Sequence, residues 1–492
     1  MTVNGGLLAL RRFGLGARPG EVEKVAQDPR GFLLGQLSQS AQARLDDPDL
    51  EPSHVTFAAA ATAQQQRKLA KDLMRESALS TAQQQVPGGD NTEQRAAARA
   101  MKGLSADEQS ANIKRAQKKE GARPARIRTE VFVDEATVRF RHQAATNVPF
   151  VERLVMFWSN HFCIMARGPV RGIAGAYERE VIRAKSFGSF TDLLKAVEQH
   201  PAMLIYLDNQ ISFGPNSPAG LNQKKGLNEN LAREILELHT LGVDGGYSQT
   251  DVTNLARIVT GWTVAALRTP NVEAGKFFYH KPRHEPGDWA VLGKNYKNED
   301  AVTGVKCLED LARHPATARH IARKFARHFV ADQVPDALTQ RLEKAFRDTE
   351  GDLTALAKTL VTSDEAWAVP ASKLLPPIDL VVALTRSLAH QTTAPEMLRL
   401  ANQLGQPLWQ PPSPKGWPDD DNGWANPSAL RERLRIAEQV ARLLDKSVDP
   451  RQLAEAVLGR DMRKETRDAV ARAENREQGL ELLIMSPDFQ RR

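Results

Sequence analysis

The sequence predicts a predominantly α-helical protein, organised as one main body and one long helical arm. Apolar residues recur at helical spacing through most of the chain, as Val22, Val25, Phe32 and Leu33 do near its start. The main break in this rhythm lies near 264–296, where short β-compatible segments stand among prolines and glycines. No sequence period of about 20–50 residues repeats, which argues against a solenoid.

The predicted arm covers residues 57–125. It is rich in Ala, Gln, Lys and Arg, which favour helices, it has few large apolar residues, and the breaker PGGDN divides it. Between Met101 and Glu130 the chain carries eight Lys or Arg residues and four Asp or Glu residues. We expect a pair of solvated helices; the alternative is a basic surface that meets an acidic partner.

The body is predicted to comprise an N-terminal helical part, residues 1–56, and a main helical part, residues 126–492. Within the main part, a capping box at Ser248–Asp251 predicts the start of a helix. A small β-ribbon or extended excursion is expected near 270–296, within the broken stretch. The segment 407–427, rich in Trp and Pro, cannot be helical and is predicted to be a loop.

Composition narrows the classes of function. The 67 Lys and Arg residues against 60 Asp and Glu residues give a net charge of +7, which is mild for 492 residues and does not demand a nucleic acid. Two cysteines, Cys163 and Cys307, exclude a disulfide scaffold and cysteine-rich zinc patterns. The sequence has no apolar run of about 18 residues for a membrane-spanning helix. It also lacks the phosphate loop, the nucleophile elbow and the HExxH zinc helix.

The pair Arg11–Arg12 looks like the start of a twin-arginine export signal. An apolar region and a small-residue cleavage site do not follow it. We therefore expect the pair to belong to the fold, and the chain to carry no export signal of its own.

The helix predicted over 228–241 carries a polar stripe. At 100° per residue, four side chains fall within an arc of about 100°: Asn230, Arg233, Glu234 and Glu237. The stripe is either a solvated face with Arg–Glu pairs one turn apart or a buried ionic cluster that forms a site. Because apolar residues flank it on both sides, we predict an interior stripe. His239 points away from it and is expected to pack in the core.

Ser159, Asn160 and His161 interrupt an otherwise apolar helix. Buried polar groups need hydrogen-bond partners, so a structural network is one interpretation. In the other, His161 is a metal ligand or a general base, because its ordinary pKa suits proton transfer near neutrality. His284, in the broken stretch, forms with His280 an HxxxH pattern that is a weak metal signal.

Two further segments are expected to be peripheral. The helix after His314–Pro315 carries a basic face that is expected to be solvated: Arg319, His320, Arg323, Lys324, Arg327 and His328. In the 407–427 loop, Trp409, Trp417 and Trp424 are expected to pack on the body, with Asp419–Asp421 exposed.

Several long strings resemble the bacterial domain of unknown function 1800 family: RRFGLGARPGE, FWSNHF, HPAMLIYLDN, GLNENLAREILELHTLGVDGGYSQTDV, HPATARHIARKFARHFV, LGQPLWQPPSPKGWPDD and SPDFQRR. The resemblance covers nearly the whole chain apart from the arm. Members of that family are often encoded beside proteins that resemble alkaline phosphatases or sulfatases and bear a twin-arginine signal. The resemblance therefore implies an exported partner that could carry this chain to the periplasm; without it, a cytoplasmic location is expected.

Two functions fit these observations, and both stay open. The first is an enzyme with a buried polar pocket built from His161, Asn230, Arg233 and Glu234, acting with the phosphatase-like or sulfatase-like partner. In its metal-dependent version, His161, Glu234 and His284 bind a divalent ion, and Arg233 holds an anionic group of the substrate. The sequence does not distinguish hydrolase chemistry from oxidoreductase chemistry. The alternative is a non-enzymatic assembly factor or chaperone for that partner. Specific nucleic-acid binding is not expected.

Overall fold

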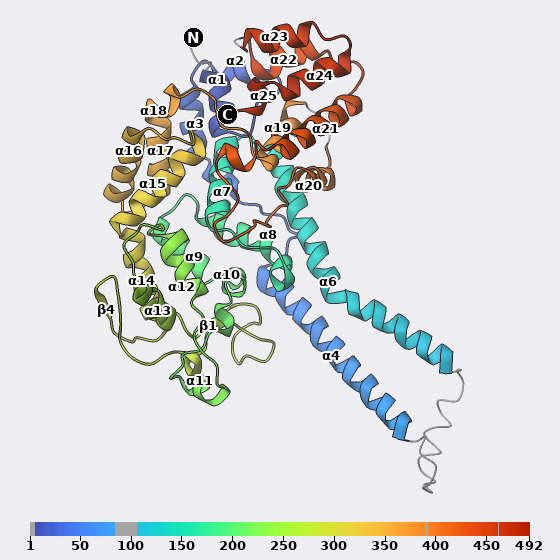
Figure 1. Ribbon diagram of the computed structural model, residues 1–492, viewed down its shortest axis with the longest axis vertical. Helices are drawn as coiled ribbons and strands as arrows, with labels where there is room; N and C mark the ends of the chain where they lie inside the picture. Colours follow the sequence, from blue (N-terminus) through green and yellow to red (C-terminus); the bar gives the residue numbers. More distant parts are fainter. Residues whose placement is uncertain (1–4, 84–105, 389–391, 461) are drawn as a thin grey trace.

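The structure is a computed structural model that describes residues 5–83, 106–388, 392–460 and 462–492 (Figure 1). Over these ranges the chain is predominantly helical, and its strands form two small two-stranded sheets. The predicted fold class is therefore confirmed. None of the helices in the described part has the length and apolarity that crossing a membrane requires.

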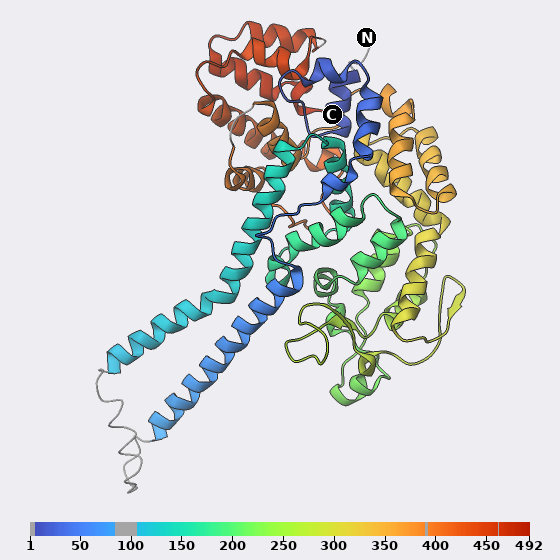
Figure 2. The same ribbon diagram turned by 180° about the vertical axis from the view of Figure 1, so that it is seen from behind.

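Two long helices, α4 (Ser53–Gln83) and α6 (Ala106–Ala145), project together from the body where the arm is predicted (Figures 1 and 2). The breaker between them lies in 84–105, outside the described residues. The arm is anchored at its base, because Ala60 of α4 and Phe140 of α6 are buried.

Helix α7 (Pro149–His161) lies at the centre of the body (Figure 1). Its side chains Phe150, Val155, Phe157 and Trp158 are at most 1% exposed, because the predicted apolar segment is surrounded on all sides. Burial of such large side chains contributes about 1.5–3 kcal/mol each. The neighbouring elements therefore pack against this helix, which forms the centre of the core.

Three groups of helices surround α7. The first follows it in the chain: α8 (Ala174–Tyr177), α9 (Phe190–Glu198), α10 (Pro201–Tyr206), α11 (Pro218–Gln223), α12 (Asn230–Glu234) and α13 (Gln249–Ile258). The second forms a column at one side of the body (Figure 1): α14 (Ala301–Arg313), α15 (Pro315–Phe329), α16 (Asp336–Asp348), α17 (Leu353–Thr362) and α18 (Glu365–Ala368). The third is C-terminal: α19 (Pro377–Ser387), α20 (Ala394–Gln403), α21 (Pro427–Leu443), α22 (Pro450–Leu458), α23 (Lys464–Ala471), α24 (Arg476–Met485) and α25 (Pro487–Gln490).

The two ends of the described chain lie close together (Figure 1). At the N-terminal end are α1 (Gly5–Leu8), α2 (Glu21–Val25) and α3 (Pro29–Leu37). Arg12 is fully buried and donates to the carbonyls of Ala366, at 2.7 Å, and Val369, at 2.8 Å. Arg11 is also buried and donates to the Phe489 carbonyl. The pair belongs to the fold, as predicted.

The broken stretch forms two short antiparallel hairpins. Strand β1 (Trp262–Val264) pairs with β2 (Phe277–Tyr279), with Thr263 opposite Phe278, and β3 (Trp289–Val291) pairs with β4 (Lys294–Tyr296), with Ala290 opposite Asn295. Strand β3 packs against α13, whose capping box at Ser248 and Asp251 is present as predicted.

Three segments of the helical body are π-helical: η1 (Ala9–Phe13), η4 (Glu178–Arg183) and η6 (Ile235–His239). Such wide turns are frequent at functional sites. Each holds titratable side chains that are at most 3% exposed: Arg11 and Arg12 in η1, Glu178 and Arg183 in η4, and His239 in η6. The body is therefore built around buried charge as well as around its apolar core.

Candidate functional site

The predicted polar stripe runs from α12 into η6 (Ile235–His239); it reaches the surface at Asn230 and Arg233 and is half-buried at Glu234 and Glu237. Asn230 is exposed, and Arg233, whose side chain is 40% exposed, pairs with Glu229 at 3.1 Å. The opposite face of the helix packs against the core through Leu231, Ala232 and the apolar residues that follow them. The prediction of an interior stripe is wrong for Asn230 and Arg233, because apolar flanks are also found where a helix buries only its opposite face. Glu234 is half-buried, and burial raises its pKa.

The structure does not bring His161, Glu234 and His284 into one ligand set. His284 is engaged elsewhere, with Nδ1 at 2.9 Å from the Thr260 carbonyl and Nε2 at 3.2 Å from the Asn298 side chain. Among the described residues, no group of three or more His, Cys, Asp or Glu side chains could hold a metal ion. The predicted trio therefore has no counterpart in the described part of the chain.

His161 is buried at the end of α7, with Nε2 at 3.2 Å from the His239 carbonyl. Since a carbonyl only accepts, Nε2 carries the proton and Nδ1 keeps a lone pair. That Nδ1 is buried, and no described residue hydrogen-bonds it. His239 packs in the core, as predicted, with Nδ1 at 2.7 Å from Glu198.

The basic face predicted on α15 is in fact two stripes, one position apart. Arg319, Arg323 and Arg327 are exposed, whereas their neighbours His320, Lys324 and His328 are buried or half-buried. The expectation that all six residues are solvated is therefore wrong. A step of one residue turns a helix by 100°, which is enough to move a side chain from solvent to the interior.

The loop at 407–427 is fastened to the last turn of α7. Asn160 accepts from the backbone N–H of Trp417 at 2.8 Å and donates to the Trp417 carbonyl at 3.1 Å. The thiol of Cys163 donates to the Pro414 carbonyl at 3.2 Å. Gly416 has φ +88°, and a Cβ there would come within 2.6 Å of the Asn160 carbonyl oxygen, so only glycine fits this approach.

At the start of this loop, Trp409 is held in the left-handed region, with φ +51°. This conformation is strained for a bulky residue. It lets the indole N–H donate to Glu178 at 2.8 Å, while the Trp409 carbonyl accepts from Ala166. The strained residue thus links the loop to the charged interior of the body.

Glu178 is the centre of a buried ionic network. It accepts from Arg139 at 2.9 Å, from Arg183 at 3.1 Å and from Ser159 at 2.9 Å, and it is 2% exposed. Burial opposes its ionisation, but Arg139 and Arg183 outweigh burial, and the pKa of Glu178 is lowered. Of the three polar residues in α7, Ser159 and Asn160 therefore have full structural roles, which leaves His161 with an unused nitrogen.

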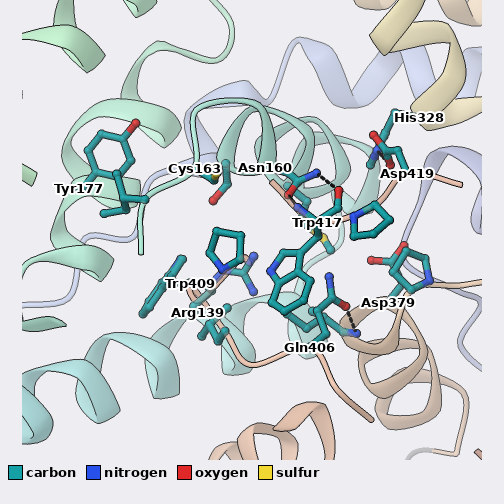
Figure 3. Close-up of a pocket in the computed structure, with 18 residues that line it drawn as sticks. Arg139, Asn160, Cys163, Tyr177, His328, Asp379, Gln406, Trp409, Trp417 and Asp419 are labelled. Carbon is teal, nitrogen blue, oxygen red and sulfur yellow. Dashed lines mark hydrogen bonds and ion pairs between the residues drawn. The ribbon is translucent and has the colours of Figure 1, made fainter. Parts of the chain in front are cut away.

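A cavity of about 80 Å³ lies between α7 and the loop (Figure 3). Ser159, Asn160 and Cys163 line it from the α7 side, and Trp409 and Trp417 from the loop. The pair His328 and Asp419 lines it at one side (Figure 3), where α15 meets the loop. This volume accommodates a few water molecules or a small polar group.

His328 and Asp419 form a directed pair, with Nδ1 of His328 at 2.8 Å from Oδ1 of Asp419. The carboxylate can only accept, so Nδ1 carries the proton and Nε2 keeps its lone pair. Nε2 is buried, and no residue in the described part of the chain hydrogen-bonds it. Contrary to the prediction of an exposed acidic run, the Asp419 side chain is only 19% exposed.

The electrostatics of the pair keep the base neutral and the acid charged. Burial lowers the pKa of His328 below its ordinary value, although Asp419 acts in the opposite direction. Burial disfavours the charged form of Asp419, but His328 and Lys373 outweigh burial and lower its pKa. At neutral pH the arrangement is therefore an ionised carboxylate that orients a neutral imidazole, which is the arrangement of a general base.

Sequence reasoning missed His328 and Asp419 as site residues. The one available signal for His328 was its spacing. His320, Lys324 and His328 follow one another at intervals of four residues, which places them on one face of a helix. Asp419 carried no signal of its own, because acidic residues next to prolines are usually solvated loop residues.

The chain matches one family model over residues 8–491, that of the protein of unknown function family DUF1800. It belongs to this family. The match includes the region of the arm as well as α7, α15 and the Trp–Pro loop, so the cavity lies within the span that defines DUF1800. No curated protein and no solved structure matches the chain.

Proposed function

We propose that this DUF1800 protein is an enzyme in which His328 acts as a general base in the cavity beneath the Trp–Pro loop, residues 407–427. The observation that carries the proposal is the pair His328–Asp419 among the residues that line the cavity, together with the buried Nε2 of His328, which no described residue hydrogen-bonds. In this reaction class, Nε2 takes a proton from a water molecule or a substrate hydroxyl, and the oxygen attacks the electrophilic atom of the substrate. The bond to the leaving group breaks, and the imidazolium returns its proton to that group. Asp419 stays ionised and stabilises the imidazolium that forms.

The surroundings of the pair support this role. The loop is held on the α7 side through Asn160 and Cys163 and covers part of the cavity, which limits its contact with bulk water. Exclusion of water strengthens the electrostatic interactions of the reacting groups. Asn160 is accordingly a positioning residue, because it holds the loop and not the substrate.

The enzyme hypothesis from the sequence is kept, but its site is different. The metal-dependent version needs His161, Glu234 and His284 to meet, and His284 is held by Thr260 and Asn298. The anion-binding role assigned to Arg233 needs an interior side chain, whereas that side chain is 40% exposed. The proposal therefore rests on His328 and Asp419.

The test is hydrolysis of a panel of p-nitrophenyl esters (acetate, phosphate and sulfate) by the purified full chain. With a substrate that turns over, His328→Gln and Asp419→Asn are expected to lower kcat by about 10²–10⁴-fold, the usual contribution of a general base. His280→Gln is the matched control, because His280 lies in the hairpin region and is expected to keep full activity. Full activity in His328→Gln contradicts the proposal.

A second candidate function is a docking protein for the phosphatase-like or sulfatase-like partner that the family resemblance implies. The observation that favours it is the projection of α4 and α6 from the body (Figure 2). Its test is co-purification with that partner after residues 70–120 are replaced by a short turn. Loss of binding with an intact body supports docking by the arm, and unchanged binding counts against it.

A further inference from the structure

A second cavity, of about 470 Å³, lies where helix α6 ends. It is bordered by α6, α19 and α20, which pack against one another (Figure 1), and by the N-terminal segment at Arg18. Among the described residues, none lines both this cavity and the one beside His328. Small-molecule sites in proteins measure about 300–1,000 Å³, so this cavity is large enough for a small organic ligand.

The lining of this cavity is strongly cationic. Three arginines contribute to it: Arg18, Arg141 and Arg386. None of the described residues that line it is Asp or Glu. Within the described ranges, the one carboxylate paired with these arginines is that of Glu21, at 3.7 Å from Nη2 of Arg386 and 3.9 Å from Nη1 of Arg18. Three guanidinium groups that share one carboxylate leave an excess of two positive charges at the cavity.

Arg18 and Arg386 also hold the end of α6. The last carbonyls of a helix have no partner within it, and cations are favourable there. The Ala144 carbonyl accepts from Nη2 of Arg18 at 3.2 Å and from Nη1 of Arg386 at 3.3 Å. Because a carbonyl is neutral, these hydrogen bonds leave the charge of both guanidinium groups uncompensated.

Arg386 keeps a donor that the end of α6 does not use. Its side chain is buried, and its Nη2 forms no hydrogen bond with any described residue. A buried donor without a hydrogen bond is rare and costs free energy. Burial lowers the pKa of Arg386 to about 10, and Arg18 adds to this effect, so the guanidinium is still charged at neutral pH.

The other side chains complete a site of mixed character. Arg141 is exposed on α6 and forms no hydrogen bond or ion pair within the described part of the chain, so it has no structural role there. Apolar walls are supplied by Phe140, Ala394 and Met397, each at most 4% exposed. The cavity thus offers guanidinium donors next to an apolar surface.

We infer that this cavity binds a small organic anion, one that carries a carboxylate or a phosphate-like group on an apolar body. Arg386 and Arg141 donate to the anionic oxygens, because a planar guanidinium matches the geometry of these groups. Phe140 and Met397 contact the apolar part of the ligand. The site goes beyond the proposed function, since it uses neither His328 nor the Trp–Pro loop.

The experiment is calorimetric titration of the full chain with four probes that separate charge from apolar body. Benzoate and phenylphosphonate carry both, inorganic phosphate carries the charge alone, and benzyl alcohol carries the body alone. We expect saturable binding of benzoate or phenylphosphonate at concentrations up to about 10 mM, weaker binding of phosphate, and none of benzyl alcohol. The bound anion is also expected to raise Tm, because a ligand that binds only the folded state stabilises it.

Two variants locate the bound anion. Arg386 itself is left in place, because its loss would also free the end of α6. Arg141→Gln removes an exposed charge and is expected to weaken binding about three- to fivefold. Thr392→Glu puts a carboxylate into the lining, where it competes for the arginines, and is expected to weaken binding at least about tenfold without lowering Tm. Arg347→Gln, at an exposed position of α16, is the matched control with wild-type affinity.

Several results would overturn the inference. These are the absence of saturable binding by the wild type, equal affinity for benzoate and benzyl alcohol, phosphate binding as tight as that of phenylphosphonate, and wild-type affinity in Thr392→Glu. If Thr392→Glu does not fold, wild-type affinity in Arg141→Gln decides against the site.

The variant His328→Gln separates this inference from the proposed function. It is expected to lose activity and to bind phenylphosphonate as the wild type does, because His328 does not line this cavity. Loss of binding in His328→Gln would place the anion in the other cavity and overturn the inference. Full activity of His328→Gln together with binding that Thr392→Glu abolishes refutes the general base and supports the anion site.

Discussion

Helices α12 and α15 carry polar stripes of the same kind and use them in opposite ways. On α12, Arg233 pairs with Glu229 one turn away at the surface. On α15, the arginines face solvent, while His320, Lys324 and His328 face the body and end at the cavity. The difference shows that a periodic pattern identifies the stripes of a helix, but the neighbouring elements decide which stripe is covered.

Buried charge also distinguishes the interior of the body, at α7 and η4, from the surface of α12 energetically. Around the cavity, Arg183, Glu152 and Glu178 are at most 2% exposed, and each depends on the others for compensation. The exposed pair on α12 is screened by solvent and salt, and pairs of this kind contribute about 0–1 kcal/mol. Substitutions in the two regions should therefore have very different effects.

The largest effect is expected for Arg183→Met. The substitution removes the partner that lies 3.0 Å from Glu152 and 3.1 Å from Glu178, and two buried carboxylates lose compensation. We expect a loss of about 3–5 kcal/mol in the free energy of unfolding, measured by denaturant titration. A loss below about 1 kcal/mol would show that water reaches this network, which would remove the contrast with α12.

Acidification is expected to destabilise the interior of the body in two steps. The pKa of His320 falls from 6.5 to about 4 on folding, so between these values the unfolded chain binds a proton that the folded chain refuses. Stability due to His320 is therefore complete above pH 6.5 and declines as the pH falls toward 4. Glu178 has a folded pKa below its ordinary 4.5, so its contribution declines below that pH.

Urea titrations at a series of pH values measure this dependence. Burial also lowers the pKa of His161 and of His328, so His320→Gln should reduce the upper step without abolishing it and should leave the lower step unchanged. Arg233→Ala should leave both steps in place. An unchanged upper step in His320→Gln would indicate that His320 is solvated like the arginines beside it.

A moderate effect is expected for Asn160→Ala. This variant loses the two hydrogen bonds to Trp417, and the free energy of unfolding is expected to fall by about 1–3 kcal/mol. The loop should also become a site of limited proteolysis. Asn222→Ala, at an exposed position of α11, is the control. Equal cleavage of the two variants would argue against the clamp on α7.

The smallest effect is expected for Arg233→Ala, at under about 1 kcal/mol. The pair with Glu229 is exposed, and Gln249 also donates to Glu229, at 2.9 Å. A double-mutant cycle with Glu229→Ala isolates the pair. A fall of about 3 kcal/mol or more in the free energy of unfolding would indicate that Arg233 is buried, as the sequence predicted, and would contradict its exposed position.

The sequence predicted those features that depend on local patterns. The apolar helix at Pro149–His161, the capping box at Ser248 and the non-helical Trp–Pro loop follow from apolar periodicity, cap chemistry and proline geometry. That Arg11 and Arg12 belong to the fold followed from the missing apolar region and cleavage site of an export signal. The arrangement of the site could not be predicted in this way. His328 and Asp419 are separated by 91 positions, and their contact depends on how the loop docks on α7.

The candidate residue His161 illustrates the same limit. The apolar helix around His161 predicted its burial. Its hydrogen-bond partner, the carbonyl of His239, lies in a π-helical turn that no sequence pattern predicted. Ser159 and Asn160, adjacent to it in sequence, reach a different network and a different loop. Three neighbouring polar residues thus have three separate surroundings.

The central claim is that His328 is a neutral base whose Nδ1 proton is held by Asp419. The most direct test is NMR of the ¹⁵N-labelled imidazole groups of the full chain, with His328→Gln used to assign the signal. We expect His328 to be neutral at neutral pH, protonated on Nδ1, and to take up a second proton only below its ordinary pKa of 6.5. A signal from a charged imidazolium at neutral pH, or from a ring protonated on Nε2, would contradict the account.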